Sequence, residues 1–256
     1  MPTPIRPAGI RILLLDIETS PNVVFSWGLY NQNISINQVI EPSKVLCWAA
    51  KWLGEETVHF SSLKQRKPLQ MLGKIHRLLE EADAVVHFNG KSFDIKHLNR
   101  EFLEYGFEPP SAFKQVDLLQ VARQNFKFLS NKLLYLLQAL ELGEKGDPGG
   151  MKTWAGCLKN DPKAWETMKT YNISDVVEME KLYLRLRPWI KGHPNYAMYS
   201  PEKAVCPTCG SDQYQHRGWH RTERYIYRRY SCKVCKKPFR GIKSEGGRQV
   251  EFTGVA

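Results

Sequence analysis

Long apolar runs are absent from this sequence: no stretch approaches the ~20 residues that a helix needs to cross a bilayer. The first seven residues, Met-Pro-Thr-Pro-Ile-Arg-Pro, are too polar for a secretory signal peptide. Internal repeats and low-complexity tracts are absent as well. These absences argue against membrane-spanning, secreted and repeat proteins, so we expect a cytoplasmic protein without a membrane partner.

Cysteine is scarce, with six residues in 256, but four of the six form two Cys-x-x-Cys pairs. The pairs are separated by 22 residues, slightly more than the commonest spacing of zinc-binding pairs. Four thiolates fill a tetrahedral structural site, so the sequence predicts one structural Zn²⁺ held by Cys206, Cys209, Cys232 and Cys235. Two disulfides are the alternative, which the expected reducing cytosol disfavours.

The stretch between the cysteine pairs indicates a β-hairpin, because Tyr225–Tyr230 (Tyr-Ile-Tyr-Arg-Arg-Tyr) is rich in strand formers. Such a hairpin would bring the two pairs together. His216 and His220 in the same stretch are interpreted as surface residues. Cys47 and Cys157 lack a partner at metal-binding spacing and are interpreted as ordinary core or surface residues.

Acidic residues are few near the C-terminus. The whole chain has 37 Lys/Arg and 26 Asp/Glu, a net charge of +11, and residues 201–256 alone hold 12 Lys/Arg and five Asp/Glu, a net charge of +7. Basic side chains bind phosphates, so this concentration predicts a nucleic-acid partner. Aromatic residues are interleaved with the basic ones. Stacking on bases and packing of a small core remain equally open for them.

Length and composition predict one large and one small domain. The chain is 42% hydrophobic and 25% charged, as is ordinary for a globular protein. We place a large domain at residues 1–190, a proline-containing linker at 191–203 and a zinc-ribbon module at 204–256. A leucine-rich helix is predicted at Leu133–Leu142. The loop that follows it, at Gly143–Gly150, is interpreted as a solvent-exposed connection, with contact to a substrate as the less favoured alternative.

Two acids, Asp16 and Glu18, follow the apolar run Ile12–Leu15, which predicts a strand buried in the middle of an α/β sheet. Side chains two apart on a strand share a face, so these acids would point the same way. Neighbouring carboxylates repel each other, and a cation relieves that repulsion. The alternative is that both acids lie past the strand end as solvated turn residues.

A second acid-bearing segment combines a strand, a turn and a helix. Ala84–Phe88 predicts a buried strand, Asn89-Gly90 breaks it, and Phe93–Tyr105 has the periodicity of a helix that stops at Gly106. Asp94 would then lie in the first helical turn, close to the carboxyl end of the strand, where α/β sheets place ligands. The alternative is an acid that only stabilises the helix start. A further acid, Asp117, is interpreted as a residue that starts a helix or supports the site without binding a metal itself.

The third segment is a predicted helix at about Pro162–Leu186 with a core-facing apolar stripe. Tyr171 and Asp175 are four residues apart, so they would lie on one face of this helix. A buried carboxylate needs a partner, which again favours a cation. A surface Tyr–Asp pair is the alternative.

Taken together, these segments resemble the exonuclease motifs of the DEDD superfamily in its tyrosine-bearing form. They are especially similar to the proofreading domain of family B DNA polymerases: Asp-Ile-Glu-Thr at Asp16–Thr19, Asn-x-x-x-Phe-Asp at Asn89–Asp94, and Tyr-x-x-x-Asp at Tyr171–Asp175. The resemblance covers about residues 10–190. It implies an α/β, ribonuclease-H-like mixed sheet flanked by helices, to which the C-terminus adds a small β-rich zinc ribbon. It also implies metal-dependent 3′→5′ exonuclease activity.

The resemblance further implies a role for each residue. Two Mg²⁺ or Mn²⁺ ions would be held by four carboxylates: Asp16 on both ions, Glu18 and Asp175 on the ion that activates water, and Asp94 on the other ion. Tyr171 would orient the attacking water, because a phenol with a pKa of about 10 is a poor base at neutral pH. Asn89 and Phe93 are the expected substrate contacts.

The expected substrate is DNA, with single-stranded ends preferred and RNA left open. The chain has no room for a polymerase domain, so the enzyme would act alone or with a separate replication or recombination partner. Its format resembles proteins of phages and bacteria, which indicates a bacterial cytoplasm or that of a phage host. The alternatives are a structure-selective endonuclease or RNase on the same fold, and a zinc-ribbon nucleic-acid-binding adaptor.

Overall fold

A mixed five-stranded sheet with the strand order β5-β4-β1-β6-β7 forms the larger part of the computed structural model, which describes residues 9–143, 146, 149–200 and 202–245. The central strand β1 (Ile12–Thr19) pairs antiparallel with β4 (Val45–Trp52) and parallel with β6 (Ala84–His87). Strand β5 (Val58–Ser62) extends the antiparallel side, and β7 (Lys114–Asp117) extends the parallel side. The predicted strand is therefore confirmed, and it is longer than predicted: the two acids lie within it rather than beyond its end.

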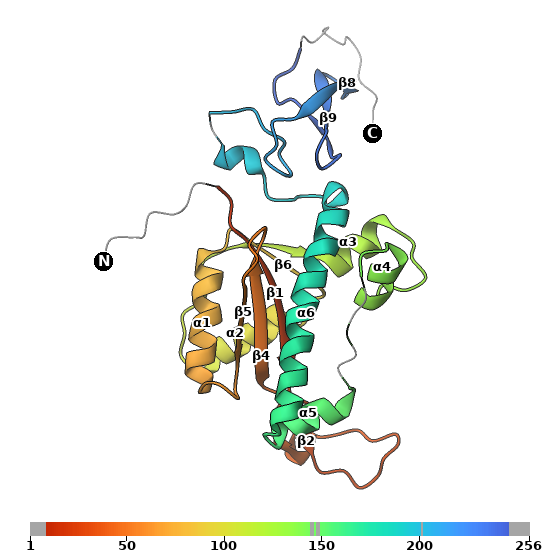
Figure 1. Cartoon of the computed structure of the whole chain (residues 1–256). Coiled ribbons are helices and arrows are strands. Elements are labelled where there is room, and N and C mark those ends of the chain that lie inside the picture. The colour runs from red at the N-terminus through yellow and green to blue at the C-terminus, as the bar shows by residue number, and fades with distance from the viewer. Residues whose placement is uncertain (1–8, 144–145, 147–148, 201, 246–256) are drawn as a thin grey trace, which may run out of the picture. The chain divides into compact units, whose positions relative to one another are not determined.

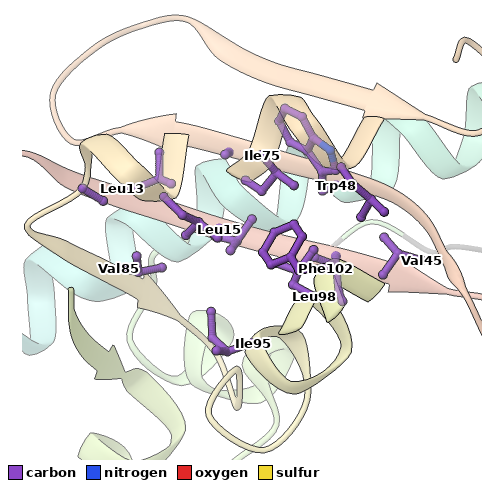
Figure 2. Close-up of a cluster of buried hydrophobic side chains, with 14 of the residues drawn as sticks. Leu13, Leu15, Val45, Trp48, Ile75, Val85, Ile95, Leu98 and Phe102 are labelled. Carbon is purple, nitrogen blue, oxygen red and sulfur yellow. The ribbon is translucent and has the colours of Figure 1, made fainter. Parts of the chain in front are cut away.

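Helices cover both faces of this sheet (Figure 1). On one face, α1 (Pro68–Glu81) and α2 (Asp94–Glu104) pack against Leu13, Leu15 and Ile17 of β1, in the apolar cluster drawn in Figure 2. On the other face, Leu46 and Cys47 of β4 contact residues of α5 (Met151–Leu158) and α6 (Pro162–Leu186). Burying one large apolar side chain contributes about 1.5–3 kcal/mol, so these two layers hold the sheet in place.

Most of the predicted helices agree with the structure. The helix α6 has the predicted bounds, and α2 ends before Gly106, whose φ of +74° suits glycine. Helix α3 (Leu118–Asn125) begins directly after Asp117, as expected. The helix predicted at Leu133–Leu142 is shorter: α4 ends at Ala139, because Glu141 adopts a left-handed conformation (φ 57°) that terminates it.

Between β1 and β4 the chain forms a short hairpin of β2 (Val23–Val24) and β3 (Val39–Glu41), with the one-turn helix η1 (Ile36–Gln38) before β3. Gln38 closes its loop: its backbone carbonyl accepts from Phe25 N, and its side chain donates to Phe25 O at 3.0 Å. The loop exposes large apolar side chains, namely Phe25, Trp27, Leu29, Tyr30 and Ile36. No residue from Pro21 to Ile40 is charged.

A second compact unit begins at Arg185, the first unit being Arg11–Leu184. It contains the short helices η2 (Arg187–Trp189) and η3 (Tyr196–Tyr199), followed by an antiparallel sheet of β8 (Tyr214–Arg221), β9 (Ile226–Cys232) and β10 (Pro238–Arg240). The predicted hairpin between the cysteine pairs is thus confirmed. The rings of Tyr214, Tyr230 and Phe239 pack together within 5.7 Å, so these three aromatic residues form a small core.

Four of the sequence-based interpretations extend beyond the residues that the structure describes. Outside them are residues 1–8 of the predicted large domain, residue 201 of the predicted linker, residues 144–145 and 147–148 of the Gly143–Gly150 loop, and the end of the predicted ribbon module after Glu245. Among the helices of the described residues, none has the length and apolar character to cross a bilayer.

Candidate functional site

Three carboxylates from two distant parts of the chain converge at the middle of the sheet. One oxygen atom each of Asp16, Glu18 and Asp175 lies within 4.8 Å of the others. The alternation along β1 explains the convergence: Leu13, Leu15 and Ile17 face α1 and α2, so Asp16 and Glu18 face the opposite side, which α6 covers. Asp175 enters from α6 itself. Three carboxylates this close repel one another, and their hard oxygen atoms suit Mg²⁺ or Mn²⁺.

A buried amide fixes one of these carboxylates. The Nδ2 atom of Asn172 donates a hydrogen bond of 2.7 Å to Oδ2 of Asp16, and the Asn172 side chain is fully buried. Asn172 lies three residues before Asp175 on α6, on the same side of the helix. No role was predicted for Asn172 from the sequence. The only indication in the sequence is its position between Tyr171 and Asp175, within the third acid-bearing segment.

The fourth acid, Asp94, does not belong to the group of carboxylates within 4.8 Å. It is the first residue of α2, and its Oδ1 accepts a hydrogen bond of 3.1 Å from the backbone N–H of Ile17, between Asp16 and Glu18. Burial, with a smaller contribution from the charge of Asp117, raises the pKa of Asp94 to about 7. The structure thus attaches Asp94 to the acid-bearing strand without placing it among the other three carboxylates.

Asp117 organises the turn that leads to Asp94. Its buried side chain caps α3 by accepting from Leu119 N (3.1 Å) and Gln120 N (3.3 Å), which confirms it as a helix-start residue. It also accepts from the backbone N–H groups of Asn89 (3.0 Å) and Lys91 (3.3 Å). Four hydrogen bonds to one carboxylate therefore hold Asn89 in its left-handed conformation (φ 68°).

The turn also requires a glycine. The N–H of Gly90 donates to Nδ1 of the buried His87 at 3.0 Å, and a Cβ atom at position 90 would lie 2.4 Å from Cγ of that ring. Because Gly90 N–H donates to Nδ1, Nε2 carries the proton and donates to Gln115 Oε1 at 3.1 Å. Burial lowers the pKa of His87, consistent with a neutral ring. The Asn89-Gly90 turn is therefore fixed by hydrogen bonds to both the Asp117 carboxylate and the His87 ring.

A pocket of about 600 Å³ opens above the carboxylates. Asp16, Asp175 and Asn89 lie on its wall, and Arg123 of α3 and Lys132 before α4 lie on the same wall. The pocket combines acids that suit a divalent cation with basic side chains that suit a phosphate. Neither Arg123 nor Lys132 was predicted as a site residue, because a single basic residue outside a motif does not indicate a binding site.

Four predicted site residues are not on the wall of this pocket, namely Glu18, Asp94, Tyr171 and Phe93. Tyr171 lies on a separate pocket of about 470 Å³ that is formed by Gly146 and residues of α6, and its ring is 6.4 Å from that of Trp154. Phe93 precedes α2, is partly exposed, and packs against His97 at a ring distance of 4.6 Å. Asn89 is the one predicted substrate contact that lies on the wall of the acid pocket.

The four cysteines of the second unit form a compact cluster. Sγ of Cys206 is 3.7 Å from Sγ of Cys235, and Sγ of Cys209 is 3.6 Å from Sγ of Cys232. Zn–S bonds of about 2.3 Å in a tetrahedron separate sulfur atoms by about 3.8 Å, so the cluster fits Zn²⁺. All four are free thiols, which rules out the alternative of two disulfides.

Backbone donors favour a thiolate at one of these positions. Burial opposes ionisation of Cys232, but N–H groups of Cys235 and Val234 outweigh it and lower the pKa of Cys232 to about 7. The N–H of Cys235 lies 3.4 Å from the Cys232 sulfur. Hydrogen bonds of this kind stabilise the charged sulfur that a metal requires.

Comparison with known proteins now defines the class of protein. The family model RNase_H_2 of the RNase_H superfamily matches residues 13–187, and the chain belongs to this superfamily. No curated protein matches the chain.

Among solved structures, the chain is similar to the family B DNA polymerase from the hyperthermophilic archaeon Pyrobaculum calidifontis, with a TM-score of 0.53 and 16% sequence identity. The match covers 86% of this chain but 32% of that polymerase, so the chain spans about a third of its length. At this identity the likeness establishes the fold alone. The expected mixed α/β, ribonuclease-H-like architecture is confirmed.

Proposed function

We propose that this protein is a metal-dependent 3′→5′ exonuclease of the tyrosine-bearing DEDD type, which hydrolyses phosphodiester bonds at single-stranded DNA ends. The observation that carries the proposal is the convergence of Asp16, Glu18 and Asp175 within 4.8 Å of one another, beside a pocket whose wall holds Asp16 and Asp175 together with basic side chains. This donor set fits two hard divalent cations, which would supply the Lewis acidity that activates water and stabilises the leaving oxygen.

Each residue then has a defined task. Asp16, Glu18 and Asp175 would hold the cations, which would supply the charge that activates water. Asn172 holds the Asp16 side chain in one orientation. Asp94 would support the second cation from outside this group, because one of its oxygen atoms already accepts from Ile17 N–H. Arg123 and Lys132 bind the phosphate that follows the scissile bond. Tyr171 would orient the attacking water through its phenol hydroxyl, while its ring packs edge-on against Trp154.

The distribution of charge between the two units supports separate roles, with cleavage in one unit and nucleic-acid binding in the other. Residues 11–184 contain 21 Lys/Arg and 21 Asp/Glu, whereas residues 185–256 contain 15 Lys/Arg and five Asp/Glu. The unit with the acid pocket therefore has no net charge with which to attract a polyanion. The zinc ribbon supplies that attraction and captures the nucleic acid.

The uncharged loop after β1 supports a preference for unpaired ends. Phe25, Trp27 and Tyr30 expose their rings, and Trp27 is fully exposed. Exposed aromatic rings stack on unpaired bases irrespective of sequence, and a paired base offers no free face. The loop follows directly in sequence on the strand that carries Asp16 and Glu18, and we assign it the bases behind a cleaved end.

Strand degradation separates this proposal from its rivals. Single-stranded DNA labelled at its 5′ end should give a ladder of shortening products with Mg²⁺ or Mn²⁺, while DNA with a blocked 3′ end should survive. The Asp16→Asn variant is the control for contaminating nuclease. Cleavage of circular single strands would instead identify an endonuclease, and cleavage of RNA alone an RNase. Intact DNA and RNA in both metals, with binding retained, would leave the nucleic-acid-binding adaptor.

A further inference from the structure

The two faces of the ribbon sheet differ in chemistry, as its register makes clear. Directly paired residues of neighbouring strands point to the same face. Arg229 pairs with Arg240, and Tyr227 pairs with His220. Since Tyr227 and Arg229 are two apart on β9, both pairs lie on the same face of the sheet. The aromatic core pair Tyr230↔Phe239 lies on the opposite face. We call the first of these, defined by His220, Tyr227, Arg229 and Arg240, the arginine face.

Like charges are held together on the arginine face. Arg229 and Arg240 are direct cross-strand neighbours, an arrangement that destabilises a sheet unless an anion lies between them. Among the described residues neither has an ion pair with an acid. The adjacent Arg228 points to the other face and is neutralised by Glu245, at 2.9 Å. Arg221, which pairs with Ile226, also lies on that other face, so the arginine face is distinguished by its direct cross-strand pair of arginines without an acidic partner among the described residues.

The two arginines are also held in place. Nε of Arg229 donates a hydrogen bond of 3.0 Å to the backbone carbonyl of Arg217. The guanidinium carbon of Arg240 lies 4.0 Å above the ring of Tyr227, and the His220 ring is 6.5 Å from that ring. Held side chains lose less conformational freedom when they bind, and a guanidinium fork matches the oxygen atoms of a phosphate.

We propose that the arginine face is where the ribbon binds the sugar–phosphate backbone of single-stranded DNA, with Arg229 and Arg240 on phosphates and Tyr227 supporting Arg240. The bound phosphates relieve the repulsion between the two arginines. The inference rests on the proposed function for its choice of DNA as ligand, and it does not depend on cleavage.

Binding of a fluorescein-labelled oligothymidine to the full-length, zinc-loaded chain tests the assignment without any reading of nuclease activity. Fluorescence anisotropy is recorded over a series of salt concentrations, in the absence of Mg²⁺ and Mn²⁺, for the wild type, the double variant Arg229→Gln/Arg240→Gln and the matched control Arg228→Gln. Each lost phosphate contact lowers the slope of log K against log salt by about 0.7 for single strands. The double variant should lose about 1.4 of slope and at least about tenfold in affinity at low salt, whereas Arg228→Gln should keep the wild-type slope.

Folding of the variants is checked by zinc content and by thermal unfolding without DNA. The double variant should be at least as stable as the wild type, because it lacks the Arg229–Arg240 repulsion. Equal losses of slope in the double variant and in Arg228→Gln would overturn the assignment of a face, and an unchanged double variant would overturn the site altogether. Either result would leave the exonuclease proposal intact, because that proposal is tested by strand degradation.

Discussion

The hydrogen bond from Nδ2 of Asn172 to Oδ2 of Asp16 joins α6 to the central strand at the point where three carboxylates meet. Both partners are tied to elements that the core holds in place, so the orientation of the Asp16 carboxylate does not depend on a cation. An amide can donate this bond, whereas a carboxylate at position 172 would add a fourth charge to the cluster. Asn172 is therefore a positioning residue for the candidate metal site.

Asn172→Ala should weaken metal binding without removing a ligand. We expect the Mg²⁺ concentration for half-maximal cleavage to rise by about 10–100-fold, with activity largely restored at saturating metal. A titration of activity against Mg²⁺ measures this, and Thr170→Ala, an exposed position of the same helix, is the control. A variant with normal metal dependence but a lower maximal rate would show that Asn172 acts otherwise.

Asp16→Asn and Tyr171→Phe should separate the metal ligands from the water-orienting phenol. Asp16→Asn should abolish cleavage and also abolish the rise in melting temperature that Mn²⁺ produces in the wild type. Tyr171→Phe should keep that rise and slow cleavage by about 10²-fold or less, because it removes only the phenol hydroxyl that orients the water and leaves the metal ligands unchanged. Melting curves with and without Mn²⁺ and single-turnover rates provide both readings. A larger rate loss for Tyr171→Phe than for Asp16→Asn would contradict the roles.

Glu101 makes the stability of the fold depend on pH. This α2 residue is buried, accepts a hydrogen bond from Val45 N–H and pairs with Arg100, and burial raises its pKa above the ordinary 4.5. A raised folded-state pKa means that the stabilisation from its proton is complete below the unfolded pKa and is lost as pH rises. The side chain of the Glu101→Gln variant stays neutral at every pH and can still accept from Val45 N–H. The free energy of unfolding of this variant, relative to that of the wild type, should therefore increase as the pH rises from below 4.5 towards neutrality.

Urea unfolding at a series of pH values measures this difference. Glu55→Gln, at an exposed position before β5, is the matched control, because solvent screens its charge and it is not paired with Arg100. A difference between Glu101→Gln and the wild type that is constant with pH would mean that the carboxyl does not titrate differently on folding.

The zinc ribbon should depend on its metal while the acid-bearing unit does not. Elemental analysis should find one zinc per chain, and Cys206→Ser should lose it. The ribbon holds too small a core to fold without a metal, so its hairpin should unfold while residues 11–184 keep their thermal transition. Cleavage should persist at a reduced rate, with DNA binding weaker and less sensitive to salt, because the net positive charge of the chain lies almost entirely after Leu184. Zinc-free protein with unchanged binding would contradict this.

Local patterns were enough to predict several elements and their side-chain directions. The helix Pro162–Leu186 was predicted with its bounds, because its apolar stripe repeats over 25 residues. The shared face of Asp16 and Glu18 follows from strand alternation alone. The shorter α4 was missed, because a left-handed Glu141 ends it without the glycine that usually marks such a stop.

Contacts between distant segments could not be predicted in the same way. Spacing placed Tyr171 and Asp175 on one side of α6, but packing set Asp175 on the acid pocket and Tyr171 beside Trp154 of α5. The resemblance grouped Asp94 with the other acids, whereas the structure attaches it to Ile17 N–H. The ribbon aromatics, for which base stacking and core packing were equally open, differ residue by residue: Tyr214, Tyr230 and Phe239 pack together, and Trp219 and Tyr225 are exposed.

By itself, the sequence determined what is set over a few residues: the period of each element, the two cysteine pairs, and which acids share a strand face. These depend on local backbone geometry, which the order of residues specifies directly. Only the tertiary structure decided that Asn172 reaches Asp16 across 156 positions, that Arg123 and Lys132 line the acid pocket, and that Arg229 meets Arg240. Such meetings depend on how whole helices and strands pack, which is a property of the complete core and of no single segment.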